Sequence, residues 1–156
     1  MDEKQIRKDR LRYTKNSLSS GLALLAILFN VFFFVNIYKS DVGSYYYSYI
    51  IGISIIYNLL FMLFGFLCSE GVKRYHFGYA VTLIVIGCLQ FVRIFIIPRM
   101  ASNAIVNEEV VMGAAQHTRV IFYLAASGAI CIIAGIIGMI RSRQLAAYEA
   151  ELAAKA

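Results

Sequence analysis

The sequence predicts an all-α integral membrane protein, a four-helix transmembrane bundle with both termini in the cytoplasm. Three observations support this prediction: an apolar composition, four long apolar runs, and basic residues gathered at one side of those runs. Of the 156 residues, 60% are hydrophobic and only 15% are charged, with a mean hydropathy of +0.69. Soluble domains are about a quarter charged, and a soluble fold of this size could not bury so much apolar surface.

The first span is predicted at residues 18–38, which carry no charge over twenty-one positions. At about 1.5 Å per residue a helix of this length crosses a bilayer. Residues 1–17 are interpreted as a cytoplasmic basic tail with six lysines and arginines. A cleaved signal peptide is disfavoured because Asp2 and Glu3 open the tail and no small-residue cleavage site follows.

The remaining spans complete a membrane domain over residues 18–140. They are predicted at 46–67, 77–97 and 120–140. Pro98 ends the third span because proline cannot continue a helix. Residues 98–119 then form an outer loop, with a short surface helix expected around 102–112, and residues 141–156 form a cytoplasmic helical tail.

The basic residues predict the orientation. Eleven of the fifteen lysines and arginines fall in the predicted cytoplasmic segments and four lie outside or near the outer face. This bias favours both termini inside, where the cations meet anionic headgroups of the lipid bilayer. The net charge of +6 is therefore attributed to the membrane surface, and no nucleic-acid partner is expected.

Three arginines near the outer face form a candidate anion or ligand site: Arg93, Arg99 and Arg119. Arg93 is the one charge placed within a predicted span, four residues before its end. Its side chain could instead extend outward to the interface, and Glu108 or Glu109 could neutralise the group. All of these alternatives stay open at the level of sequence.

A polar layer is predicted at mid-membrane depth from Asn30, Asn58 and Gln90, one in each of the first three spans. Side-chain amides in a bilayer seek partners across helices, and each such hydrogen bond contributes roughly 0.6 to 2 kcal/mol. Interhelical bonding is the favoured interpretation over a conduction path.

The fourth span carries small residues at a spacing of four, which predicts a helix-packing face. Its members are Ala125, Ala129, Cys131, Ala134, Gly135 and Gly138. Such faces allow another helix to approach closely, either inside the bundle or from another protein.

The sequence lacks the residues needed for proton-coupled transport, thiol redox chemistry or metal binding. No Asp, Glu or Lys lies inside a span, whereas proton-coupled carriers need a buried carboxylate. Cys68, Cys88 and Cys131 form no C-x-x-C pair. His76 and His117 have no second ligand at metal spacing. No catalytic residue, metal or cofactor is therefore expected.

Size and span number are similar to those of the membrane-bound glutathione and eicosanoid enzymes. That family's chemistry depends on Arg, Asn and Glu grouped around the second helix, whereas the second span here carries Asn58 but no Arg. The resemblance is one of architecture alone, and a shared architecture does not imply a shared function.

The sequence favours a non-enzymatic accessory or stabilising subunit of a larger membrane assembly such as a transporter, bound to a membrane-protein partner or to itself. The alternative is a small-ligand carrier or homo-oligomeric channel that uses Arg93 and the polar layer, and an enzyme is third. The absence of Trp and of an N-glycosylation sequon favours a bacterial cytoplasmic (plasma) membrane.

Overall fold

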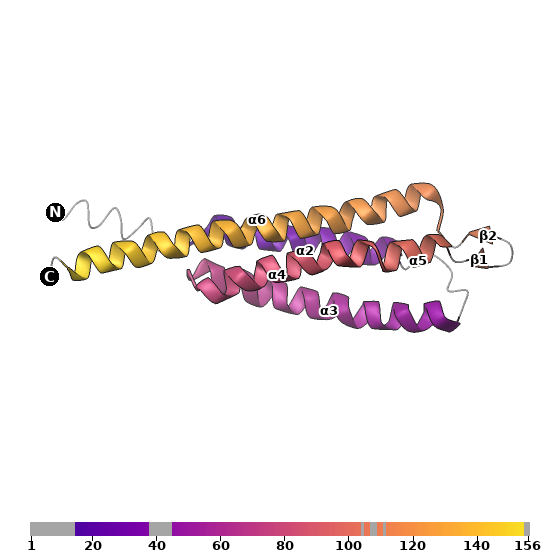
Figure 1. Ribbon diagram of the computed structural model, residues 1–156, viewed down its shortest axis with the longest axis horizontal. Helices are drawn as coiled ribbons and strands as arrows, with labels where there is room; N and C mark the ends of the chain where they lie inside the picture. The colour runs from indigo at the N-terminus through magenta and orange to yellow at the C-terminus, as the bar shows by residue number, and fades with distance from the viewer. Residues whose placement is uncertain (1–14, 38–44, 104, 107–108, 111, 155–156) are drawn as a thin grey trace.

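The computed structural model describes residues 15–37, 45–103, 105–106, 109–110 and 112–154. Within this part of the chain four long helices lie lengthwise beside one another as a bundle (Figure 1). They are α2 (Ser17–Ile37), α3 (Tyr45–Lys73), α4 (Phe77–Ile94) and α6 (Ala114–Ala153). All four belong to stretches long and apolar enough to cross a membrane. This confirms the prediction of an all-α, multi-pass membrane protein with four spanning helices.

The third predicted span is divided into two helices. Helix α4 ends at Ile94, and the short helix α5 (Ile97–Asn103) follows after a turn. Pro98 explains the break, because a proline ring clashes with the carbonyl four residues earlier and lacks an N–H to donate. In the first turn of α5 the missing N–H costs nothing, since no intrahelical acceptor exists there.

A β-ladder lies where a short surface helix was expected around residues 102–112. Strand β1 (Ile105–Val106) pairs antiparallel with β2 (Glu109–Val110). The expectation of a helix was wrong because three of the four strand residues, Ile105, Val106 and Val110, are β-branched and favour extended backbone.

Hydrogen bonds between helices identify the two ends of the bundle. Asn16 N donates to Lys73 O at 3.0 Å, and Ser142 Oγ donates to Tyr75 O at 2.7 Å. The start of α2, the α3–α4 turn and the last part of α6 therefore share one end. We call this the basic end, after the basic residues of its described part: Lys15, Lys73, Arg74, Arg141 and Arg143.

The opposite end carries α5, the β-ladder and the start of α6 (Figure 1). There Gln116 Nε2 donates to Asn36 O at 2.7 Å and joins the end of α2 to α6. We call this the loop end.

Helix α6 packs closely against α4 through small residues. A Cβ added to Gly135 would lie 2.6 Å from Ala80 O, and one added to Gly128 would lie 3.0 Å from Gly87 O. Such an approach of two backbones is possible only without side chains between them.

The predicted helix-packing face is used mainly inside the bundle. Cys131, Ala134, Gly135 and Gly138 are buried, whereas Ala125 and Ala129 are partly buried. These four buried residues therefore pack within the chain itself.

Serine hydroxyls form hydrogen bonds between α2 and its neighbours α3 and α6. Ser19 Oγ donates to Ala134 O at 2.6 Å, and the Ser20 and Ser69 hydroxyls lie 2.8 Å apart. In a bilayer, where burial of apolar surface does not drive helices together, such contacts add to packing.

The close crossing of α4 and α6 gives a stability prediction. Gly135→Ala is expected to lower the free energy of unfolding by about 1–3 kcal/mol, because the new methyl meets a backbone oxygen that cannot move aside. Thermal unfolding in detergent, followed by circular dichroism, measures the change.

Gly52→Ala is the matched control, since nothing lies within 4 Å of the added methyl in α3. It should leave stability unchanged or raise it by up to about 1 kcal/mol through helix propensity. Equal effects of the two variants would contradict the close approach.

Candidate functional site

Arg93 lies inside the bundle and does not extend to the interface. Its side chain is only 6% exposed. Ala80, Leu83, Gly87 and Gln90 are also buried on α4, at spacings of three and four that define one helix face. The helical register of α4 therefore directs Arg93 toward the other helices.

Two residues of α3 hold the guanidinium group. Arg93 Nη1 donates to Asn58 Oδ1 at 2.7 Å, and Arg93 Nη2 donates to Ser54 Oγ at 2.8 Å. Ser54 and Asn58 are four residues apart and so lie on one face of α3. The planar guanidinium, with donors fixed in a fork, is suited to two acceptors placed in this way.

Gln90 extends the network to α2 and α6. Its Nε2 donates to Asn30 Oδ1 at 2.9 Å and lies 3.4 Å from Ser127 Oγ, which itself donates to Ala26 O at 2.9 Å. Arg93 Nη1 also lies 3.5 Å from Asn30 Oδ1. One connected set of hydrogen bonds therefore links all four long helices.

We call this set the Arg93 cluster. Its members are Asn30, Ser54, Asn58, Gln90, Arg93 and Ser127. All six side chains are buried. Asn30 Oδ1 accepts mainly from Gln90 Nε2, with Arg93 Nη1 farther away, while Asn30 Nδ2 meets no acceptor among the described residues.

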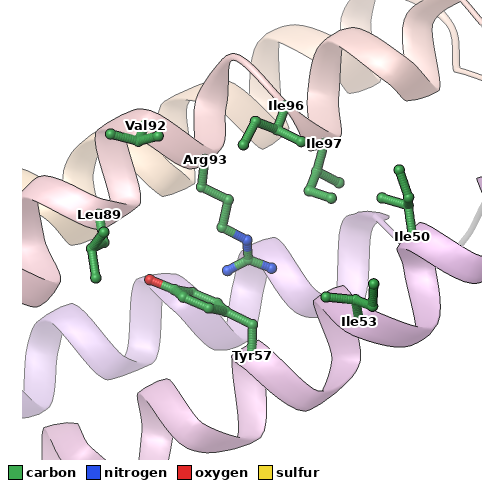
Figure 2. Close-up of a pocket in the computed structure, with 8 residues that line it drawn as sticks. All are labelled: Ile50, Ile53, Tyr57, Leu89, Val92, Arg93, Ile96 and Ile97. Carbon is green, nitrogen blue, oxygen red and sulfur yellow. The ribbon is translucent and has the colours of Figure 1, made fainter.

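Two aromatic rings enclose the guanidinium. Its central carbon lies 4.4 Å from the centre of the Phe33 ring and 4.7 Å from that of Tyr57. Figure 2 shows the Arg93 side chain reaching from α4 over the Tyr57 ring on α3. Cation–π contacts of this kind strengthen when water is excluded.

A groove of about 320 Å³ lies between α3 and the α4–α5 segment. Its walls are formed by Ile50, Ile53, Tyr57, Leu89, Val92, Arg93, Ile96 and Ile97 (Figure 2). Ile53 and Val92 are each 55% exposed, so the groove opens on the outer surface of the spans. We call it the α3–α4 groove.

The structure gathers some predicted residues and separates others. Asn30, Asn58 and Gln90 lie together around Arg93, as the hydrogen bonds above show. Arg99 on α5 and Arg119 on α6 are exposed, in a different environment from buried Arg93. A joint anion site of the three arginines stays a prediction, and Glu108 lies outside the described residues.

Sequence reasoning missed two members of the cluster. Ser54 lies four residues before Asn58, which was a usable signal for a second acceptor on the same face of α3. Ser127 lies among the small residues of α6, and nothing in its sequence context separates it from a packing residue.

The partners of the guanidinium differ in chemistry from a carboxylate or an imidazole. The partners named for Arg93 are amides, a hydroxyl and aromatic rings. None of these gains or loses a proton near neutral pH. These hydrogen bonds therefore link α4 to α3 around the guanidinium.

Comparisons of the chain with protein-family models, with curated proteins and with solved structures find no match. A function for this chain must therefore be argued from its own residues.

Loss of one acceptor tests the cluster. Asn58→Leu is expected to lower the free energy of unfolding by about 1–2 kcal/mol, because a buried charged donor loses its shortest hydrogen bond. Titration of the detergent-solubilised protein with SDS measures this change.

Asn36→Leu serves as the control, since the Asn36 side chain bonds only to Phe32 O of its own helix in the described structure. It should change the unfolding free energy by less than about 0.5 kcal/mol. The role of the cluster is refuted if Asn58→Leu behaves in the same way.

Proposed function

We propose that this protein is a non-enzymatic, multi-pass subunit that stabilises a larger assembly, such as a transporter, in a bacterial cytoplasmic membrane. The observation that carries the proposal is the Arg93 cluster. Polar side chains within the spans bind one another across four helices. Such a network supports a rigid body, whereas carriers place polar groups along a path for substrate.

The length of α6 offers a second support. At about 1.5 Å per residue its forty residues extend about 60 Å, roughly twice the hydrocarbon thickness of a bilayer. Figure 1 shows its last part projecting beyond the α3–α4 turn at the basic end. We propose that this extension, residues 141–153, contacts the partner.

The charge distribution supports an orientation for the proposal. Lys73, Arg74, Arg141 and Arg143 lie at the basic end, and basic residues concentrate on the cytoplasmic side of membrane proteins. We therefore place both termini and the α6 extension in the cytoplasm.

The alternative is a small-ligand carrier or homo-oligomeric channel. The observation in its favour is that Arg93 lines the α3–α4 groove as well as the interior. A substrate-dependent activity of the purified protein alone, abolished by Arg93→Ala, would favour this alternative and refute the subunit proposal.

The subunit proposal predicts a stoichiometric partner after gentle extraction at native expression level. Size analysis and mass spectrometry of the extracted material should show one larger membrane protein with this chain. A monomer or homo-oligomer without other proteins would contradict the proposal.

Two double variants test the α6 extension. Leu145 and Leu152 are partly buried and lie seven residues apart on one face of the helix, as coiled-coil contacts do. Changing both to Asn should reduce recovery of the partner by about tenfold, since central interface residues each contribute above about 1 kcal/mol.

The control changes Ala146 and Ala153 to Asn, with the same spacing on an exposed face. It should retain the partner. Full recovery with the leucine variant, or equal loss in both, would contradict docking through this face.

A further inference from the structure

We propose that the α3–α4 groove binds one acyl chain of an anionic phospholipid, whose phosphate is held by Arg99. This inference goes beyond the proposed function and does not depend on it. Figure 1 shows α3 and α4 diverging from their turn toward the loop end. The groove occupies this interval on the outer surface of the bundle.

The walls of the groove are those of a hydrocarbon site. Ile50, Ile53, Leu89, Val92 and Ile96 supply aliphatic surface from both helices (Figure 2). Both helices belong to apolar stretches long enough to span a bilayer. The medium at the mouth of the groove is therefore acyl chain.

The residues at the floor of the groove are compatible with a hydrocarbon occupant. Arg93 and Tyr57 form it (Figure 2), but the guanidinium donates inward to Asn58 and Ser54 and is 6% exposed. An occupant therefore meets the Tyr57 ring and aliphatic carbon, and its anionic group must be bound elsewhere.

The volume of the groove is suitable for a flexible chain. The groove measures about 320 Å³, near the lower end of the 300–1,000 Å³ typical of small-molecule sites. An acyl chain of the surrounding lipid can enter a groove of this size.

Arg99 supplies a cation at the loop end of the groove. Met100 N donates to Ile96 O at 3.0 Å, so a helical turn begins at Ile96. Arg99 lies three residues after Ile96, which lines the groove, and it is exposed. Arg99 is therefore about one helical turn from Ile96, on the same side of the helix. A lipid whose chain lies in the groove thus brings its phosphate near a guanidinium, to which phosphate binds in bidentate fashion.

Native mass spectrometry tests the proposal on the full chain released from nanodiscs of equal phosphatidylglycerol and phosphatidylcholine. The wild-type protein should retain one phospholipid, with phosphatidylglycerol preferred. Ile53→Trp should abolish retention by filling the groove. Ile133→Trp, at a position on α6 that is 49% exposed, should retain the lipid.

A second pair of variants tests the headgroup. Arg99→Gln should lower the preference for phosphatidylglycerol over phosphatidylcholine about fivefold, as expected for one cation near a charged headgroup. Arg119→Gln removes the same charge from an exposed position on α6 and should leave the preference unchanged.

Circular dichroism confirms that each variant keeps its helices before lipid binding is compared. The proposal is overturned if the folded wild-type protein retains no lipid, or if either pair of variants behaves alike. It is also overturned if a co-purified polypeptide crosslinks to the groove in place of lipid.

Discussion

A guanidinium placed within a membrane span must find acceptors inside the protein, and this requirement organises the bundle. An isolated charge in hydrocarbon is costly, and Arg93 meets the requirement with Asn58 and Ser54 on α3. The rings of Phe33 and Tyr57 lie against the guanidinium, at 4.4 Å and 4.7 Å from its central carbon. Because these partners lie on α2 and α3, the position of α4 fixes the positions of its neighbours.

Helix α4 makes different kinds of contact with α6 and with α3. Toward α6, glycines at 87, 128 and 135 let the backbones meet with almost nothing between them. Toward α3, the long Arg93 side chain and the Tyr57 ring lie between the helices (Figure 2). The first contact excludes lipid, and the second leaves the α3–α4 groove open to it. The groove is thus a consequence of how the charge is buried.

The sequence predicts the number and type of the helices because hydropathy and length determine which segments cross a bilayer. It also identified Asn30, Asn58, Gln90 and Arg93 as unusual residues for their depth. It could not predict their partnership, because contacts between helices depend on rotation about each axis, which depends on packing. The β-ladder was missed because its strands have only two residues each.

A double-mutant cycle on Arg93 and Asn58 tests the central claim most directly. Arg93→Met and Asn58→Leu are each expected to destabilise the bundle, since each leaves a buried partner without its bond. The double variant removes both polar groups. Its loss in free energy of unfolding should be smaller than the sum of the two single losses by at least about 1 kcal/mol. A coupling energy near zero would show that the two residues act independently and would contradict the account.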